Sequence, residues 1–273
     1  MNNWPPHPGA FPRLVGFALV IGLLTIAPWA AEAAECPSED LEPGPRVTIQ
    51  AVAVDGTLRE VSGREIRLAG INLPRAALGH EPAQPLAEEA RRALEELTLG
   101  KTLDLHLVPK RRDRYDPMLA HPCLVDGGWL HALLLERGLA MVATTRDTTL
   151  LATEMLALEK TARAAKAGIW NERAFRVRTP YETRRGIDTY QIVEGRVVSA
   201  VVIKGRAYLN FGQDWRTDFT FSISPRDRRR FEHQGIDLAG LASRRVRGRG
   251  WVTLRNGPLI ELTHPEQLEI LPE

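Results

Sequence analysis

Residues 64–74 read Arg-Glu-Ile-Arg-Leu-Ala-Gly-Ile-Asn-Leu-Pro, and they contain a short predicted strand, residues 65–68. Two predicted strands precede it, residues 46–53 and 57–61. In the first of them apolar and polar residues alternate, and the turns at Asp55-Gly56 and Ser62-Gly63 join the three segments. Three short strands joined by tight turns predict the start of a β-meander.

The pattern after residue 74 alternates between helix and strand. A helix is predicted where apolar residues recur at helical spacing, and glycines mark three helix ends. The predicted elements are a helix at 84–99, strands at 102–108 and 118–125, and helices at 129–137 and 150–166. Pro122 restricts the second of these strands to a sheet edge or a bulge. A five-stranded barrel with a helix between its third and fourth strands is the OB arrangement.

The same region resembles the staphylococcal nuclease (thermonuclease) family. That family has a strand ending in Arg-Leu, then a hydrophobic pair, then Asp-x-Pro-Glu, and residues 67–75 follow this plan in part. The likeness continues in order through further segments, which are 86–90, 113–115, 134–140 and 167–170. The resemblance covers residues 46–173 and implies a nuclease-type OB barrel there.

The resemblance also implies a chemistry, calcium-assisted phosphodiester hydrolysis. In the family two aspartates hold Ca²⁺, a glutamate positions the attacking water, and two arginines stabilise charge on phosphorus. Arg67 matches the first arginine, whereas Asn72, Arg75 and Pro117 replace the aspartate, the glutamate and the second arginine. The family's Asp-Gly-Asp-Thr turn is shortened here to Asp55-Gly56-Thr57, which displaces Asp55 from the ligand position. Asp55 and Asn72 are therefore only weak candidates for metal ligands. No resident cofactor is therefore expected, and calcium-dependent cleavage by the family mechanism is not expected either.

A basic loop lies beside the expected phosphate pocket. Together with Arg67 and Arg75, the loop provides candidate phosphate contacts for DNA, RNA or nucleotides, which are Arg111, Arg112, Arg114 and Tyr115. The alternative is a solvated, charge-rich loop. A rearranged catalytic set of Asp55, Asp113, Asp116 and Arg67 would instead make an active phosphodiesterase.

The carboxyl-terminal third is a second strand-rich region. Residues 174–186 are polar and aperiodic and predict a linker, and residues 187–273 predict a small accessory OB-like barrel. Within this barrel the pattern predicts a strand at 190–203 and helical segments at 225–235 and 237–242. The fold class is thus mainly β with helices, α+β. The second region is rich in arginine and aromatic residues, and Trp215 in a polar turn is its best exposed candidate for nucleic-acid binding. The alternative is that the aromatics, Phe219 and Phe221 above all, fill a core while the arginines coat helices.

The amino-terminal segment has the features of an export signal. Arg13, an apolar run and Ala31-Glu32-Ala33 predict a signal peptide over residues 1–34, followed by a linker over 35–45. The protein is therefore expected to be periplasmic or secreted. An uncleaved anchor is the alternative, and it would be the protein's contact with the membrane. Cys36 and Cys123 form either a disulfide or a buried thiol and a spare one.

Composition limits the function classes only broadly. The chain is 44% hydrophobic and 26% charged with a net charge of +2, as expected of a globular protein. The seven histidines, including His80 and His131, lack metal-ligand spacing, so zinc is not expected. The expected function is a degenerate nuclease homologue that binds nucleic acid or another phosphate-bearing ligand. The alternatives are the rearranged phosphodiesterase and an envelope scaffold that contacts proteins. Nothing in the sequence indicates an oligomeric state.

Overall fold

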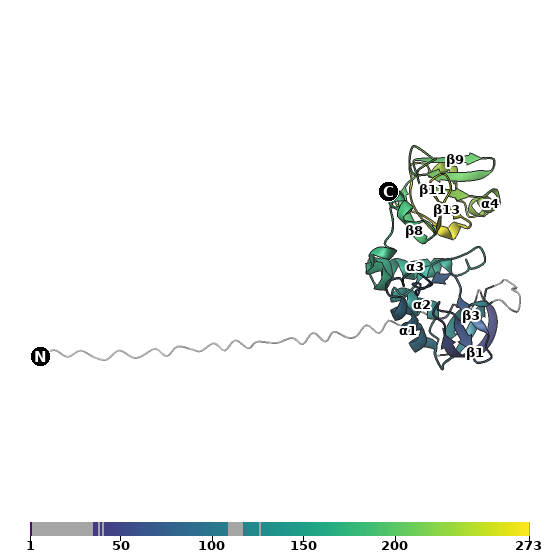
Figure 1. Cartoon of the computed structure of the whole chain (residues 1–273), viewed down its shortest axis with the longest axis vertical. Coiled ribbons are helices and arrows are strands. Elements are labelled where there is room, and N and C mark those ends of the chain that lie inside the picture. The colour runs from purple at the N-terminus through teal and green to yellow at the C-terminus, as the bar shows by residue number, and fades with distance from the viewer. Residues whose placement is uncertain (2–34, 38, 40, 109–116, 126, 273) are drawn as a thin grey trace. The chain divides into compact units, whose positions relative to one another are not determined.

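The computed structural model of the chain describes residues 1, 35–37, 39, 41–108, 117–125 and 127–272 (Figure 1). Residues 33–273 form one compact unit. Within the described residues, no helix combines the length and the apolar character needed to span a membrane. The predicted signal segment and the loop at 109–116 lie outside the described residues.

Five strands of the first half close into a barrel in the order β1-β2-β3-β6-β5. They are β1 (Glu42–Val52), β2 (Leu58–Glu60), β3 (Glu65–Leu68), β5 (Thr102–Leu107) and β6 (Met118–Leu124). Only β3 and β6 pair in parallel, and α1 (Ala87–Thr98) stands between the third and fourth barrel strands in chain order. The nuclease-type OB arrangement is confirmed. Strand β1 starts at Glu42, earlier than the predicted start at Arg46, because its first residues pair with the end of β5.

The helices α2 (Leu130–Glu136) and α3 (Ala152–Ala164) follow the barrel, and a small two-stranded sheet lies beside them. This sheet pairs β4 (Ile71–Asn72) with β7 (Met141–Val142). The buried His131 ring places Nε2 at 2.9 Å from the carbonyl oxygen of Ala69, so it is structural, and His80 is exposed. Cys36 and Cys123 form a disulfide, one of the two alternatives that the sequence leaves open.

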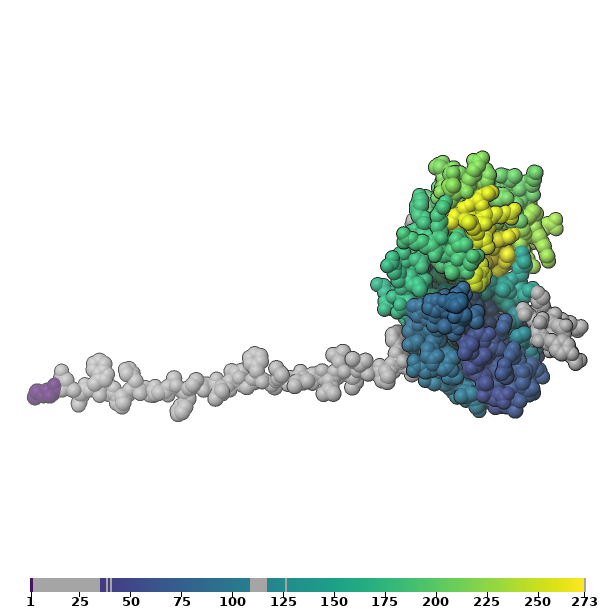
Figure 2. Space-filling model, viewed as in Figure 1, coloured from purple at the N-terminus to yellow at the C-terminus, as the bar shows by residue number. Residues whose placement is uncertain are grey.

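The segment between the two halves is ordered into short 3-10 helices. These are η1 (Gly168–Asn171), η2 (Arg173–Phe175) and η3 (Pro180–Gly186). Thr179 and Glu182 form a capping box at the start of η3. Phe175 belongs to a buried hydrophobic cluster that joins Met141, Ala162 and Ile169 to Ile192 of the next strand. The predicted linker is therefore packed into the molecule. In the space-filling view the two halves of the compact unit are in contact with each other (Figure 2).

The second half has the OB strand order as well. Its strands are β8 (Tyr190–Arg196), β9 (Ser199–Ile203), β10 (Arg206–Asn210), β11 (Thr220–Ile223), β12 (Arg245–Leu254), β13 (Pro258–Leu262) and β14 (Leu268–Ile270). The hydrogen-bonded path runs β12-β13-β11-β10-β9, and β8 pairs with β12. Only Val197 and Val198 separate β8, which pairs with β12, from β9 at the other end of this path. Strands β11 and β13 pair in parallel, as β3 and β6 do in the first barrel.

Local details of the second barrel differ from prediction. The predicted strand 190–203 is interrupted at Val197–Val198, because its two parts pair with different neighbours. The predicted helix at 225–235 is α4 (Pro225–His233), whereas 237–242 contains only the 3-10 turn η4 (Ala239–Leu241). A final 3-10 turn, η5 (Pro265–Gln267), precedes β14. Phe219 and Phe221 are buried in the core, as predicted.

Candidate functional site

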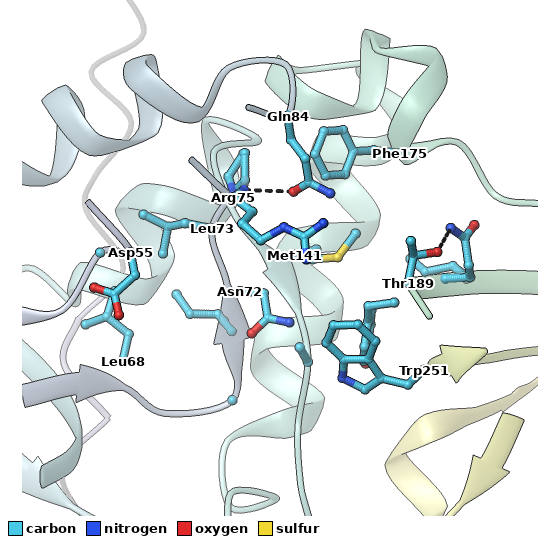
Figure 3. A pocket seen from close by; sticks show the side chains of 18 of the residues that line it. Asp55, Leu68, Asn72, Leu73, Arg75, Gln84, Met141, Phe175, Thr189 and Trp251 are labelled. Atoms are coloured by element: carbon cyan, nitrogen blue, oxygen red, sulfur yellow. Dashed lines mark hydrogen bonds between the residues drawn. The ribbon is translucent and has the colours of Figure 1, made fainter. Parts of the chain in front are cut away.

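A cleft of about 730 Å³ opens where the first barrel meets the ordered segment and the second barrel. Its lining includes the β1–β2 turn, the strand β4 with the loop after it, residues 174–178, and residues of β8 and β12. Figure 3 shows Asn72 between Asp55 on one side and Trp251 on the other, with Arg75 above it in this view. The cleft therefore contains residues that lie far apart in the sequence.

The β1–β2 turn holds Asp55 at one side of the cleft. The backbone N–H of Thr57 donates to Asp55 Oδ1 at 3.0 Å, and Gly56 has a φ of +81° that favours glycine. Asp55 Oδ2 lies 3.6 Å from Arg67 Nη2, and Arg67 Nε donates to Thr57 Oγ1 at 3.4 Å. Partial burial acts to raise the pKa of Asp55, but the hydrogen bonds from Thr57 and the charge of Arg67 outweigh it and lower the pKa overall. Asp55 is thus a carboxylate at neutral pH.

Asn72 reaches the cleft because of a tight turn before β4. Gly70 has a φ of +75°, and a Cβ there would lie 2.9 Å from Met155 Cε and 3.2 Å from the carbonyl oxygen of Thr148. The backbone N–H of Ala143 donates to the Gly70 carbonyl at 2.8 Å. Only glycine fits this close approach, which sends the exposed side chain of Asn72 into the cleft.

Arg75 is fixed through its backbone rather than through its side chain. Its N–H donates to Gln84 Oε1 at 2.7 Å, and the N–H of Gln84 donates back to the Arg75 carbonyl at 2.8 Å. The guanidinium pairs with Glu81 at 2.9 Å, where both side chains are exposed. Such a pair contributes little and is open to competition by another anion. Arg75 is therefore a cation available to a ligand in the cleft.

The charge of the cleft is strongly positive. Among its described lining residues stand one carboxylate, Asp55, and five arginines, which are Arg67, Arg75, Arg176, Arg178 and Arg185. Burial lowers the pKa of Arg178, and the nearby charge of Arg176 adds to this effect. Arg178 is held by Gln191 Oε1 at 3.2 Å, and Arg176 pairs with Glu182. For Arg185 no ion-pair partner is found in the part of the chain that the structure describes.

The described residues of the cleft provide few of the ligands that a calcium ion takes. Calcium takes six to eight oxygen ligands, several of them carboxylates. The described lining offers the Asp55 carboxylate, which faces Arg67, and the neutral amide of Asn72. Elsewhere among the described residues, donor atoms of Cys36, His106 and Cys123 lie within 4.8 Å of one another. The two sulfurs there are bonded to each other, so they are not metal ligands in this state.

The structure brings together four of the residues that the sequence singles out, Asp55, Arg67, Asn72 and Arg75. Pro117 is described but is not part of the cleft lining. Trp215 lies outside the lining; its side chain is 51% exposed and stacks with the Arg216 guanidinium at 4.5 Å. The remaining candidates lie outside the described residues and stay predictions, and they are Arg111, Arg112, Arg114 and Tyr115 with Asp113 and Asp116.

The arginines of β12 correct one expectation. The arginines of the second region are expected either to bind nucleic acid or to face solvent. Arg249 does neither, because it is 1% exposed and pairs with Glu159 and Glu269. Arg247 likewise pairs with Glu194 and Glu269. Every second residue of β12 faces outward, and on this face Arg249 lies against Val142 and Glu159 of the first half of the chain.

Several cleft residues were not among the sequence candidates. They are Arg176, Arg178, Arg185, Tyr190 and Trp251. The three arginines fall in the predicted linker, residues 174–186, and their density there is a signal of a cationic site. Trp251 is one of the aromatic residues of the second region, and nothing in the sequence relates it to Asn72.

Comparison with known proteins shows which family one part of this chain resembles. Residues 65–172 match the family described as "Staphylococcal nuclease homologue". The "Probable staphylococcal-like nuclease CAN1" of Oryza sativa subsp. japonica is 32% identical over 120 residues, which are 44% of this chain and 32% of that protein. The "Probable endonuclease LCL3" of Schizophyllum commune (strain H4-8 / FGSC 9210) is 31% identical over 132 residues, which are 44% of each chain. This chain thus contains a staphylococcal-nuclease-like domain, and it spans between about a third and a half of the length of these relatives.

Proposed function

We propose that the cleft binds nucleic acid through its phosphates, and that the protein hydrolyses it slowly or not at all. The observation that carries this proposal is the lining of five arginines and one carboxylate around Asn72. Guanidinium groups bind phosphate oxygens in bidentate fashion, and such contacts release counterions. Names of the relatives, which refer to nucleases, support the choice of nucleic acid over other anions.

The same lining argues against rapid cleavage by the calcium route. With Asn72 and Arg75 in the cleft, two positions that carry carboxylates in the family provide no negative charge. The loss of one such electrostatic partner typically costs about 100- to 1000-fold in rate. The protein is therefore proposed to act as a binding module derived from a nuclease. The disulfide between Cys36 and Cys123 supports the further proposal that it works in an exported compartment.

Salt-dependent binding to a labelled oligonucleotide tests this proposal. Fluorescence anisotropy with single-stranded DNA should give an affinity that falls steeply with salt. Substitution of Arg67 or Arg178 by alanine should weaken binding and reduce the slope of log K against log salt by about 0.7 per lost contact. Arg229→Ala removes the same charge from the exposed surface of α4, outside the cleft, and should leave both values unchanged. Binding without a salt slope, or an equal effect of Arg229→Ala, would refute the proposal.

A rearranged phosphodiesterase is the second candidate, and the position of Asp55 favours it. The carboxylate is ionised, lies in the cleft and faces Arg67 at 3.6 Å. Parallel incubations with calcium, magnesium or a chelator measure this activity. Metal-dependent cleavage that disappears in both Asp55→Asn and Arg67→Ala would establish it in place of the binding module.

A further inference from the structure

The outward face of β8 and β12 reaches from the contact between the barrels into the cleft. On β12 the outward residues are Arg247, Arg249 and Trp251, whereas Val246 and Val252 point into the core. Trp251 pairs with Tyr190 of β8 in the antiparallel register. Trp251 is therefore the next outward side chain after the buried Arg249.

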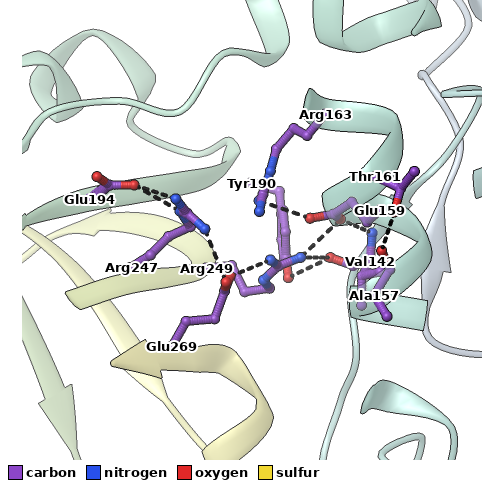
Figure 4. Close-up of polar contacts among 10 residues, drawn as sticks. All are labelled: Val142, Ala157, Glu159, Thr161, Arg163, Tyr190, Glu194, Arg247, Arg249 and Glu269. Carbon is purple, nitrogen blue, oxygen red and sulfur yellow. Dashed lines mark hydrogen bonds and ion pairs between the residues drawn. The ribbon is translucent and has the colours of Figure 1, made fainter. Parts of the chain in front are cut away.

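Buried polar contacts fix this face against the first half of the chain (Figure 4). Arg249 Nη1 donates to the Val142 carbonyl at 3.2 Å and to Glu159 Oε2 at 3.0 Å. The Tyr190 hydroxyl donates to the same Val142 carbonyl at 3.4 Å. Val142 belongs to β7, whose other residue, Met141, pairs with Asn72 of β4. A short series of backbone and side-chain contacts thus fixes the position of Trp251 relative to Asn72.

The Trp251 ring is exposed where these contacts end. Its residue is 54% exposed and lines the cleft across from Asn72 (Figure 3). Tyr190 supports it with an edge-to-face contact, 6.3 Å between ring centroids at 85°. A large aromatic plane on a fixed strand loses little conformational entropy when a ligand stacks on it. Among the described lining residues, the arginines supply cations for phosphate in the same cleft.

We propose that Trp251 is a stacking platform for an unpaired nucleobase, which makes the cleft selective for single-stranded nucleic acid. This inference rests on the proposed function, because it assumes that phosphates occupy the arginine side of the cleft. Exposed aromatic rings beside a cationic groove are the combination with which proteins bind single strands. Paired bases in a duplex are stacked on one another and present no free face to an indole. The platform belongs to β12 and lies outside residues 65–172, the region that matches the nuclease family.

Three labelled probes separate the base contact from the phosphate contacts. They are a thymidine oligonucleotide, an abasic oligonucleotide of equal length, and a duplex. The full chain should bind the thymidine oligonucleotide most tightly. Trp251→Ala should weaken that binding by about 5- to 100-fold, with an unchanged salt slope and an unchanged affinity for the abasic probe. Trp251→Phe should retain most of the affinity. Tyr181→Ala removes an exposed aromatic ring outside the cleft and serves as the control.

The outcomes distinguish this inference from the proposed function. If the wild type binds the thymidine and abasic probes equally with a salt slope, and Trp251→Ala changes neither, phosphate binding stands and the stacking platform is refuted. If Trp251→Ala weakens both probes equally, the ring acts through the fold, and the platform is again refuted. If the wild type binds no probe at all, the proposed function and this inference both fail. Thermal melting of each variant shows whether it is folded.

Discussion

Arg249 of the second barrel and Glu159 of α3 form an ion pair with a separation of 3.0 Å, and their side chains are 1% and 0% exposed. Two buried charges are tolerated because each has further partners. Glu159 accepts from the Val142 N–H at 2.7 Å and from Arg163 at 3.1 Å. Arg249 also pairs with Glu269, and the arginine charges outweigh the effect of burial and lower the pKa of Glu269. The network is therefore almost fully satisfied.

Removing one member of this pair should be strongly destabilising. Arg249→Met leaves Glu159 buried with one fewer cation beside it. A change of this kind typically lowers the free energy of unfolding by about 3–5 kcal/mol. Urea unfolding followed by circular dichroism measures the effect. Arg59→Ala breaks an exposed pair with Glu65 and should cost at most about 1 kcal/mol. A loss no larger than that of Arg59→Ala would mean that the buried pair does not hold the barrels together.

Stability should fall as the pH is lowered from about 6.5 to 4. Burial lowers the pKa of His131 from 6.5 to about 4, although its bond to Ala69 opposes this, and burial also lowers the pKa of His264 from 6.5 to about 4. In this pH range the unfolded chain binds protons that the folded chain does not. Each histidine contributes a loss of roughly 3 kcal/mol by pH 4. Urea unfolding at pH 7 and pH 4.5 checks the sign, with the exposed His80→Gln as a neutral control. Equal stability at both pH values would contradict the buried, uncharged state of both rings.

Loss of the disulfide should lower the melting temperature. The bond between Cys36 and Cys123 joins residues 87 apart in the sequence. The disulfide restricts the unfolded chain, and for a loop of this size it raises the free energy of unfolding by about 2–5 kcal/mol. Cys36→Ala, Cys123→Ala and the reduced wild type should melt at similarly lowered temperatures in calorimetry. A single cysteine variant that melts like the oxidised wild type would show that the bond is absent in solution.

Carboxylates at positions 72 and 75 should weaken the binding of anions in the cleft and strengthen the binding of cations. Asn72→Asp together with Arg75→Glu returns two negative charges to the cleft, so Ca²⁺ binding should appear in isothermal titration calorimetry. Oligonucleotide affinity should fall by about tenfold or more, because cationic contacts are lost. Asn72→Leu with Arg75→Gln is the matched variant without new carboxylates. If the wild type already binds calcium as tightly as the double variant, the cleft does not depend on these positions for its charge preference.

The sequence predicts both barrels because their signals are local. Alternation of apolar residues and turns such as Asp55-Gly56 can be recognised from a few neighbouring residues. Arg67, Asn72 and Arg75 are also close in the sequence, so their grouping in one cleft can be predicted as well. The break at Val197–Val198 escapes prediction, since it arises from pairing with two different strands, β12 before the break and β10 after it. Arg249 and Trp251 escape for a related reason. A buried arginine looks like an exposed one in sequence, and its partner Glu159 is 90 residues away.

The hydrophobic cluster that joins Met141 and Ala162 to Ile192 connects the two halves of the chain into one folding unit. The match to the nuclease family ends at residue 172, inside that cluster. A chain ending there would expose apolar surface on α3 and leave Glu159 without Arg249. The end of the family match is thus not a boundary of folding. Residues 35–272 should melt in a single cooperative transition, with the second barrel acting as an obligate half of the nuclease-like fold.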